Sequence, residues 1–367
     1  MKVLILNDFR EKGGAELVAY NTFLALQAVN NMEVSFTSID DVDKGYFRRS
    51  NFINAFFYVF NPVVYENFKK LLISQRPDVI HLHNFYHAFS PSVLSAIKAY
   101  KKRYRAKIIM TAHDYHLLCP NSGFVRYFSK GGFKNCTKCI DRRFYRVLFY
   151  NCDKRGLIYS ALKGIRHTFC YNLLGLQSVV DIFISPSRFL KEKLLSAYPD
   201  LTVEIINNPV FELEKNFDTI TKKAEDCPHF ELVFIGRLSK EKGLEEFIKN
   251  DFARLNPQSF GIIGEGDQKD DLVKLVAEMR LGDKIKFLGR KSHIESLAVL
   301  HNAEKLVLPS TWYENQPLVL LEALALGKEI IVNPVGGMKE ISENQTFFKN
   351  AWREKLYTEK LLQLYHN

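Results

Sequence analysis

The sequence predicts an α/β fold in which two doubly wound, Rossmann-like domains face a central cleft. This prediction rests on the length of the chain and on two separate series of alternating strands and helices. At 367 residues the chain is long for one hydrophobic core, because a domain usually holds about 100–200 residues. A content of 47% hydrophobic and 25% charged residues is typical of an ordinary folded protein.

The first series occupies the first half of the chain. Short apolar runs predict strands, and the segments between them carry apolar residues at the three- and four-residue spacing of helices. Such alternation favours a parallel sheet with helices on both faces. We predict strands at 3–7, 34–38, 79–83, 107–111 and 182–186, and helices at 15–29, 63–74 and 91–103.

The second series begins after a segment at 207–230, which contains Pro209 and Pro228 and is interpreted as a linker. Ser292 followed by Glu295 forms a capping box and predicts a helix start. The predicted domains are therefore 1–206 and 231–348, and residues 349–367 are predicted to form a terminal helix that packs back on the first domain. Within the second domain we predict strands at 231–236, 260–264, 285–288, 306–309 and 330–333, and helices at 244–255, 270–280, from 292 onward, and at 317–326.

The net charge of +10 is concentrated in one segment. From Arg126 to Arg166 the chain has eleven Lys or Arg and two Asp, a local excess of nine (11 − 2). This basic segment also contains eight aromatic residues, and it falls within an insertion predicted at about 119–170. Basic residues interleaved with aromatic ones suit an anionic membrane surface, a phosphate-bearing acceptor or nucleic acid, and the alternative is a solvated basic face.

The start of the chain indicates where the protein works. Asn7 and Asp8 end the first apolar run after Leu6, which makes the run too short for the core of a signal peptide. No apolar run approaches the roughly 18 residues of a membrane-spanning helix. We therefore expect a cytoplasmic protein, and the basic segment adds the expectation of peripheral contact with the inner face of the cell membrane.

Two elements are suited to binding phosphate. Gly13 and Gly14 follow the first predicted strand and open a helix, where backbone amides can approach a phosphate, although such a pair is also typical of a tight turn. Arg237 lies at a strand end and Lys242 at the next helix start. A planar guanidinium and a point charge together suit a diphosphate, and the alternative is two solvated surface cations.

Two glutamates flank the start of an apolar helix. Pro317 suits the first turn of a helix, which places Glu314 in the preceding loop and Glu322 in the second turn. A carboxylate among apolar neighbours is costly without hydrogen-bond partners, and sugar hydroxyls are suitable partners.

Together these motifs resemble glycosyltransferase family 4, a family of retaining enzymes with the GT-B fold. The motifs are, in order, Gly13-Gly14-Ala15-Glu16, Gly236-Arg237-Leu238 with Lys242-Gly243, Gly264-Glu265-Gly266, and Tyr313-Glu314-Asn315 through Glu322-Ala323. The resemblance covers essentially the whole chain, and the two glutamates separated by seven residues are its most specific part. It implies transfer of a sugar from a nucleotide-diphosphate sugar, with a UDP-sugar favoured, to a lipid-linked glycan or a polysaccharide held by the first domain.

The resemblance also implies residue roles. Arg237 and Lys242 would neutralise the departing diphosphate, Glu314 would hold hydroxyls of the transferred sugar, and Glu322 would bind the ribose. His113, after the fourth strand, would lie near the donor sugar, whereas His81, His83 and His116 are interpreted as structural or acceptor-side. The implied catalytic residues are His113, Arg237, Lys242 and Glu314, and the implied donor-binding residues are Gly13, Gly14, Arg237, Lys242, Gly264, Glu314, Asn315, Gln316 and Glu322.

The implied chemistry requires no metal, because cations and backbone amides already in place would stabilise charge on the leaving group. Asp41-Val42-Asp43 has the D-x-D spacing that holds a metal in another transferase fold, but it lies in a polar loop without nearby ligand candidates. No general base is evident, and the leaving phosphate is inferred from the family type to serve that role.

Six cysteines are present, and four of them cluster in the insertion. Cys119, Cys136, Cys139 and Cys152 include one C-x-x-C pair, which favours a structural zinc site over a disulfide in a cytosolic protein. A redox pair and free thiols are the alternatives.

Two other classes of function fit parts of the sequence. A nucleotide-sugar epimerase or a phosphorylase could share the fold, but the cofactor-bearing lysine motif of phosphorylases is not found. A zinc-bearing nucleic-acid-binding protein would explain the basic segment, but it would leave Glu314 and Glu322 without a purpose. We therefore expect no nucleic-acid partner.

Overall fold

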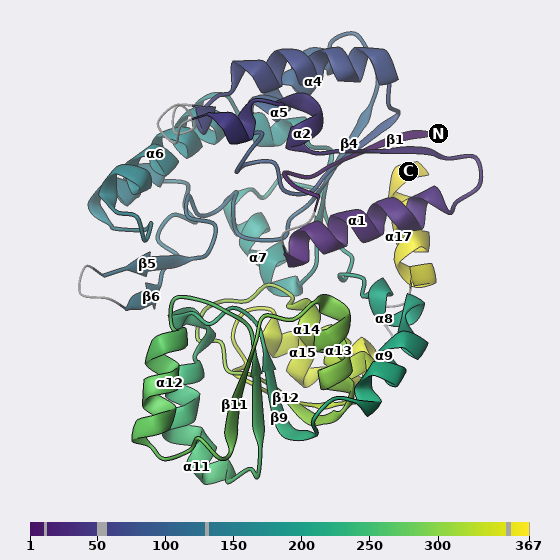
Figure 1. Cartoon of the computed structure of the whole chain (residues 1–367). Helices are drawn as coiled ribbons and strands as arrows, with labels where there is room; N and C mark the ends of the chain where they lie inside the picture. The colour runs from purple at the N-terminus through teal and green to yellow at the C-terminus, as the bar shows by residue number, and fades with distance from the viewer. Residues whose placement is uncertain (11–12, 50–56, 129–131, 350–353, 367) are drawn as a thin grey trace. The chain divides into compact units, whose positions relative to one another are not determined.

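The computed structural model describes residues 1–10, 13–49, 57–128, 132–349 and 354–366. The chain forms two compact units, which are described separately below (Figure 1). Unit 1 combines Met1–Asn207 with Tyr357–Asn367, and unit 2 comprises Asn208–Leu356. Within the described ranges, none of the helices has both the length and the apolar character that crossing a lipid bilayer requires.

Unit 1 is built on a six-stranded sheet in the order β2-β1-β3-β4-β7-β8, and every neighbouring pair is parallel. Most residues of the central strands are fully buried, as expected for a parallel sheet covered on both faces. Because β2 and β3 lie on opposite sides of β1, the strand order reverses there. The strands are β1 (Lys2–Leu6), β2 (Glu33–Thr37), β3 (Val79–Leu82), β4 (Lys107–Thr111), β7 (Ile182–Ser185) and β8 (Val203–Ile205).

Local capping explains where several helices of unit 1 begin. The side chain of Asn61 accepts hydrogen bonds from the backbone N–H groups of Val63 and Val64, and Pro62 occupies the first position of α4. Ser187 caps α7 in the same way by accepting from the N–H of Leu190. These helices are α1 (Gly14–Gln27), α2 (Ile39–Val42), η1 (Tyr46–Arg48), α4 (Pro62–Gln75), α5 (Ser92–Lys101) and α7 (Arg188–Ala197).

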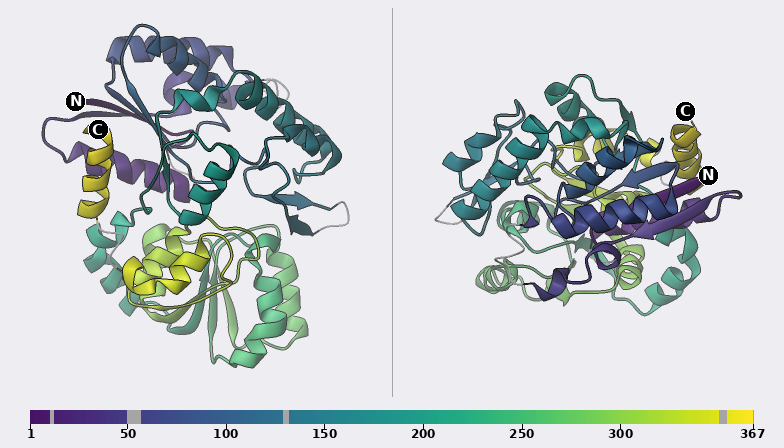
Figure 2. Two further views of the ribbon diagram at one scale, coloured as in Figure 1. Left: turned by 180° about the vertical axis from the view of Figure 1, so that it is seen from behind. Right: turned by 90° about the horizontal axis from the view of Figure 1, so that it is seen from above.

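The segment between β4 and β7 is the predicted insertion. It opens with an antiparallel hairpin of β5 (Val125–Tyr127) and β6 (Phe133–Asn135), which projects away from the six-stranded sheet (Figure 2). The chain then forms a helical region, in which α6 continues directly into a π-helix, η3. The helical elements are η2 (Phe144–Phe149), α6 (Leu157–His167), η3 (Thr168–Leu173) and η4 (Leu176–Val179).

The terminal helix α17 (Glu354–His366) packs against unit 1, beside α1 (Figures 1 and 2). The Tyr357 hydroxyl lies 2.6 Å from Oγ1 of Thr22 on α1. The Tyr365 hydroxyl lies 2.5 Å from Nδ1 of His81 on β3. Two buried tyrosines therefore attach α17 to α1 and to β3 of unit 1.

Unit 2 contains a five-stranded sheet in the order β11-β10-β9-β12-β13, and all neighbouring pairs are parallel. The first strand, β9, is central, and the chain adds strands on one side of it before crossing to the other. The strands are β9 (Phe230–Ile235), β10 (Phe260–Ile263), β11 (Ile285–Gly289), β12 (Ala303–Leu308) and β13 (Glu329–Val332). The GT-B fold class predicted from the sequence, with two Rossmann-like domains, is confirmed by these two sheets and by the solved structures compared below.

The helices of unit 2 differ from the sequence prediction in three places, one of which is the pair at Met338–Glu343 and Gln345–Phe348, which was not predicted. The interval 207–230, interpreted as a linker, contains α8 and α9, and buried Ile220 and Ala224 join α9 to the core. The single helix predicted at 244–255 is interrupted by a π-helical turn, η6. The helices are α8 (Phe211–Lys215), α9 (Phe217–Glu225), η5 (Lys240–Lys242), α10 (Leu244–Glu246), η6 (Phe247–Asp251), α11 (Phe252–Leu255), α12 (Lys269–Glu278), α13 (His293–His301), α14 (Leu318–Ala325), α15 (Met338–Glu343) and α16 (Gln345–Phe348).

Candidate active site

The candidate donor site lies at the carboxyl ends of the strands of unit 2. The strand order reverses at β9, whose neighbours β10 and β12 follow it in opposite directions across the sheet. Ligands of doubly wound sheets bind outside the carboxyl ends of the strands at such a reversal. The loop after β9 carries Arg237 and Lys242, and the loop after β12 carries Glu314. The topology therefore places the predicted residues at this switch point.

Glycines allow these loops to pack backbone against backbone. A Cβ on Gly264 would lie 1.8 Å from the carbonyl oxygen of Gly236, and one on Gly243 would lie 2.1 Å from that of Pro309. Both glycines also have positive φ angles, 142° and 73°, which side-chain-bearing residues rarely adopt. Gly264, predicted from the resemblance to bind the donor, therefore has a packing reason to be glycine, and its role in binding stays a prediction.

Lys242 and Glu314 form a nearly buried ion pair. Lys242 Nζ donates to Glu314 Oε1 over 2.6 Å, and the two side chains are 16% and 10% exposed. The same oxygen accepts hydrogen bonds from Ser310 Oγ at 2.8 Å and from Trp312 Nε1 at 2.7 Å. Lys242 also lies 5.6 Å from the centre of the Trp312 ring, within cation–π range. Three donors from two loops thus fix this carboxylate.

Glu314 is held in its ionised form. Burial alone would raise the pKa of its carboxyl group. The charge of Lys242 and the hydrogen bonds from Lys242, Trp312 and Ser310 outweigh this effect and lower the pKa below its usual value. The site therefore presents a fixed negative carboxylate beside a fixed ammonium group at neutral pH.

Arg237 pairs with a residue that the sequence analysis did not single out. Its Nη2 donates to Glu241 Oε1 over 2.5 Å. The Glu241 side chain is only 1% exposed, whereas that of Arg237 is 60% exposed. The backbone carbonyl of Glu241 also accepts from the N–H of Thr311 in the loop after β12. Glu241 thus fixes the guanidinium group of the exposed Arg237, and it joins the loop after β9 to the loop after β12.

Glu322 contacts a histidine that the sequence analysis missed. On α14, Glu322 is buried, and its Oε1 lies 2.6 Å from Nε2 of His293. The capping box formed by Ser292 and Glu295 fixes His293 as the first residue of α13. That cap was recognised in the sequence, but the 29-residue separation from Glu322 gave no local sign of the contact.

Asn315 and Gln316 have different surroundings. The side-chain Oε1 of Gln316 accepts from the N–H of Asn208 at 2.6 Å, and its backbone carbonyl accepts from the Asn208 side chain at 3.1 Å. These two bonds tie Gln316 to the start of unit 2. Asn315 is also buried in this loop. The structure thus gives Gln316 a structural role, and donor binding by both residues stays a prediction.

In unit 1, polar residues gather at the carboxyl ends of β1, β3 and β4. Asp8, directly after β1, is buried and accepts hydrogen bonds from the N–H groups of His87, Ala88 and Phe89. Its pKa is raised to about 6, because burial outweighs these three bonds. Gly13 is the N-cap of α1, and Gly14 is its first residue. The predicted phosphate loop therefore begins a helix at the edge where Asp8 lies.

His113, which is half-buried, stacks on the buried imidazoles of His83 and His81. His113 Nε2 lies 2.8 Å from Nδ1 of His83, and their rings stack with centres 5.0 Å apart. His83 stacks in turn on His81, which contacts Tyr365 and Thr111. Burial lowers the pKa of His113 to about 4, so its ring is neutral at physiological pH. His113 can therefore donate or accept a hydrogen bond as a neutral imidazole.

Asp114, beside His113, is a half-buried acid to which no role was assigned from the sequence. Its pKa is raised to about 7, because burial outweighs the N–H of His116 and the positive charge of Arg166. The Tyr86 hydroxyl donates a hydrogen bond to its Oδ2. Asp8 and Asp114 thus titrate near neutrality at this end of the sheet, as groups at functional sites often do.

Unit 1 is expected to lose stability as the pH falls from 6.5 toward 4. A histidine whose folded pKa is depressed stabilises the fold above its unfolded pKa and ceases to do so as the pH falls through the folded value. Asp8 and Asp114 have raised pKa values and act in the opposite direction, losing their stabilisation as the pH rises through about 6 and 7. The histidines with depressed pKa values are His81, His83, His113, His116 and His167.

Five histidines outnumber two acids, so unfolding takes up protons in this window. Each net proton changes the free energy of unfolding by about 1.4 kcal/mol per pH unit. Urea unfolding at pH 7, 6 and 5 should therefore show a fall of at least that size per unit. An increase in the free energy of unfolding as the pH is lowered from 6.5 to 5 would contradict the expectation.

The candidate metal ligands do not form a recognisable site. Among the described residues, no group of three or more His, Cys, Asp or Glu side chains is arranged to hold a metal ion. Asp41 caps α2 and pairs with Arg10, whereas Asp43 is buried against Arg49 and Asn61.

The cysteines of the insertion nevertheless influence one another. Burial, together with the neighbouring thiols of Cys119 and Cys136, raises the pKa of Cys152 to about 12. The pKa of Cys139 is likewise raised by burial and by the other three thiols of the group. The four thiols thus lie in one neighbourhood without metal-site geometry, and zinc binding stays a prediction from the cysteine spacing.

Two family models match separate parts of the chain. Residues 216–367 match the model described as glycosyl transferases group 1. Residues 8–154 match the model of the starch synthase catalytic domain. The glycosyl transferase match spans almost all of unit 2, including Arg237, Lys242, Glu314 and Glu322.

Curated relatives and a solved structure agree with these matches. An uncharacterised 42.6 kDa protein in the cps region of Klebsiella pneumoniae is 26% identical over 77% of this chain and 64% of its own length. Glycogen synthase of Mycobacterium tuberculosis is 39% identical over 30% of this chain. The chain spans about a quarter of that enzyme, 27% of its length. The crystal structure of HepE from Anabaena in complex with UDP-glucose aligns with 99% of both chains, at a TM-score of 0.60 and 15% identity. Taken together, the matches support a glycosyltransferase with the GT-B fold.

Proposed function

From the GT-B fold and the glycosyltransferase matches, we propose that this chain is a retaining glycosyltransferase of family 4. It takes a sugar from a nucleotide-diphosphate sugar, and a UDP-sugar is favoured because the HepE structure that it resembles contains UDP-glucose. One observation carries the proposal: the Lys242–Glu314 pair lies at the switch point of unit 2, where a doubly wound sheet binds its ligand.

In this proposal Lys242 and Arg237 stabilise the departing diphosphate. Lys242 is held by Glu314 and Trp312, and Arg237 is held by Glu241, so both cations are in place before the donor binds. Charge placed in advance at a developing anion is usually the largest catalytic term. The N-terminus of α1, with Gly13 and Gly14, adds backbone amides for phosphate. These groups supply the positive charge that a metal provides in other transferases.

The two glutamates bind the hydroxyls of the donor. The three side-chain donors of Glu314 all bond Oε1, so Oε2 is available to accept from the transferred sugar. Glu322 binds the ribose, with His293 fixing the orientation of its carboxylate. His113, as a neutral imidazole, hydrogen-bonds the sugar, and Asn315 and Gln316 complete the loop around it. An oxygen of the leaving phosphate takes the proton of the acceptor hydroxyl, which enters on the same face.

The acceptor in this proposal is a polysaccharide or a lipid-linked glycan in the cytoplasm. One relative is a glycogen synthase, whose product is a polysaccharide. Unit 1, which carries the insertion and the acids Asp8 and Asp114 with their raised pKa values, would take the acceptor.

Thermal unfolding with UDP, GDP and ADP tests the donor site. A ligand that binds only the folded state stabilises it by about 2.7 kcal/mol at 100 times its Kd. We expect one diphosphate, UDP in the favoured case, to raise the melting temperature of the wild type and to lose most of this effect in Arg237→Gln. Arg254→Gln is the matched control, because Arg254 also pairs with a carboxylate in unit 2 but is 78% exposed. No shift with any diphosphate would overturn the proposal.

A further inference from the structure

The helix α6 and its continuation η3 have two different faces. One face packs inward and consists of buried residues at helical spacing, Ser160, Gly164, His167 and Tyr171. The opposite face is apolar and also follows helical spacing. We call it the outward stripe, and it consists of Ile158, Leu162, Ile165, Phe169 and Leu173.

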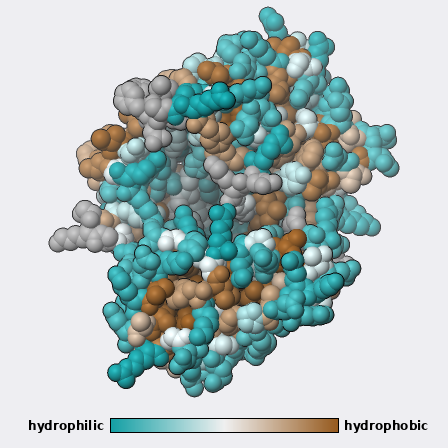
Figure 3. Space-filling view, in the orientation of Figure 1, coloured by the Kyte–Doolittle hydropathy of each residue, from teal (hydrophilic) through white to brown (hydrophobic). Residues whose placement is uncertain are grey.

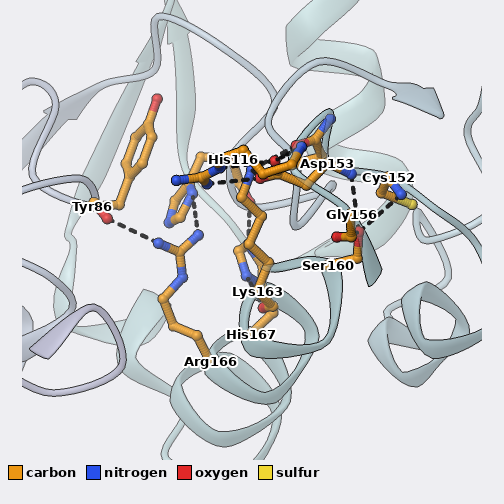
Figure 4. A network of polar contacts seen from close by, with 11 residues as sticks. Tyr86, His116, Cys152, Asp153, Gly156, Ser160, Lys163, Arg166 and His167 are labelled. Atoms are coloured by element: carbon orange, nitrogen blue, oxygen red, sulfur yellow. Dashed lines mark hydrogen bonds and ion pairs between the residues drawn. The ribbon is translucent and has the colours of Figure 1, made fainter. Parts of the chain in front are cut away.

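The inward face is fixed by packing and by buried polar contacts (Figure 4). A Cβ on Gly164 would lie 2.3 Å from a methyl group of Val147, so η2 packs directly against the helix at this point. Arg166, which is fully buried, donates to the carbonyl of Tyr86 at 2.8 Å. His167 contacts the carbonyl of His116 at 2.6 Å. The helix therefore cannot rotate to bury its outward stripe without breaking these contacts.

The outward stripe is exposed despite its apolar composition. Ile158 and Leu173, at its two ends, are 78% and 72% exposed, and Ile165 between them is 53% exposed. A helix on the surface of a soluble protein normally carries polar residues on this face. Phe149, at the end of the neighbouring η2, is 76% exposed and adds to the apolar surface. Brown, apolar residues are visible at the left margin of Figure 3, where α6 lies in Figure 1.

Exposed cations border the stripe. Lys154 and Arg155 directly precede α6, and both are exposed. Lys98 lies at the far end, where its Nζ is 3.4 Å from the carbonyl of Leu174. Without the buried Arg166, the segment from Arg126 onward still has ten Lys or Arg and two Asp, an excess of eight (10 − 2). An apolar helix face bordered by Lys and Arg fits the interface of an anionic bilayer, where apolar side chains enter and cations contact headgroups.

We propose that the outward stripe of α6 and η3 docks on an anionic lipid surface, with the helix lying in the plane of the interface. The inference rests on the proposed function for its purpose, which is to bring the enzyme to a lipid-linked acceptor. The same stripe could instead pair with a second copy of this chain, but the surrounding excess of positive charge opposes association of two identical surfaces.

Flotation with vesicles tests the proposal on the full chain. The probes are phosphatidylcholine vesicles with and without phosphatidylglycerol, at low and high salt. We expect the wild type to float with the anionic vesicles at low salt, and high salt or the absence of phosphatidylglycerol to weaken binding. Ile158→Glu with Ile165→Glu should reduce the fraction bound at least about tenfold, because it puts charge into the apolar layer.

The matched control is Leu255→Glu with Val273→Glu in unit 2. It replaces two apolar residues that are 43% and 44% exposed and changes the net charge by the same amount. We expect this variant to float like the wild type. Failure of the wild type to float, or equal loss in both variants, would overturn the proposal. So would a wild-type dimer that the stripe variant converts to a monomer without vesicle binding.

The UDP-induced rise in melting temperature is measured in parallel on the same proteins. If UDP still stabilises the protein but the protein does not float, only the proposal of a membrane-docking surface is overturned. Flotation without any nucleotide effect would overturn only the proposed function.

Discussion

Replacing Lys242 by methionine is expected to lower kcat for sugar transfer by about 10²–10³-fold, the usual effect of removing one pre-placed group that stabilises developing charge. Methionine keeps much of the side-chain length and removes the ammonium group. Lys242 is the charged donor to Glu314, and its side chain is only 16% exposed. Steady-state kinetics with the donor identified by thermal unfolding provide the measurement.

Lys249→Met is the matched control for this variant. Lys249 also forms a 2.5 Å ion pair in unit 2, with Glu245, but its side chain is 47% exposed. Exposed pairs contribute little, so kcat should remain within about twofold of the wild type. A kcat for Lys242→Met within the same range would contradict the assigned role.

The double variant Lys242→Met with Glu314→Gln separates stability from catalysis. Removing Lys242 alone leaves a buried carboxylate without its cation, which usually costs about 3–5 kcal/mol. Replacing Glu314 as well removes that uncompensated charge and should restore part of the stability. The activity should stay low, because neither the cation nor the sugar-binding carboxylate is restored.

Gly264→Ala is expected to lower the free energy of unfolding by about 3–5 kcal/mol, at the upper end of the range for single substitutions. A Cβ at this position would lie 1.8 Å from a backbone oxygen of Gly236. The alanine would also have to adopt a φ of 142°. The clashing atoms belong to the backbone, which cannot move aside as the end of a flexible side chain could. Urea denaturation monitored by circular dichroism measures the effect.

Gly282→Ala is the control for this substitution. A Cβ there would meet no atom within 4 Å, and Gly282 lies in an exposed turn of the same unit. Its effect should stay within about 0.5 kcal/mol of zero, as for other surface changes. Equal urea midpoints for the two variants would show that the loops after β9 and β10 can separate without cost.

The sequence predicted the sheets well, because parallel strands buried on both faces have a strong local signal. Each of the five strands predicted in unit 1 is present within one residue at either end. The sixth, β8, was missed because Val203–Ile205 is only three residues long. The interval interpreted as a linker contains prolines, but the buried face of α9 made it part of unit 2.

The site could be predicted only where its signal is local. Lys242 and Glu314 were assigned from motifs, and the structure brings them into contact. His293, Glu241 and Asp114 were missed because their contacts depend on how separate loops and helices pack. The insertion was recognised as basic and aromatic, but its helix α6 was not predicted. Its apolar residues do follow the helical period, but they lie on the exposed face. The buried residues are Ser160, Gly164, Arg166 and His167, so the usual link between apolar character and burial does not hold for this helix.

The attachment of α17 to unit 1 has a consequence for how the chain can be divided. Because Tyr357 and Tyr365 return to α1 and β3 of unit 1, unit 2 is a continuous segment inserted between two parts of unit 1. A genetic cut at residue 207 would thus separate the first sheet from its own closing helix and expose the surfaces around Thr22 and His81. Modular exchange would respect both junctions, with residues 208–356 replaced as a cassette and the two outer pieces kept together. If unit 2 binds the donor as proposed, such an exchange would change the donor preference and leave unit 1 whole.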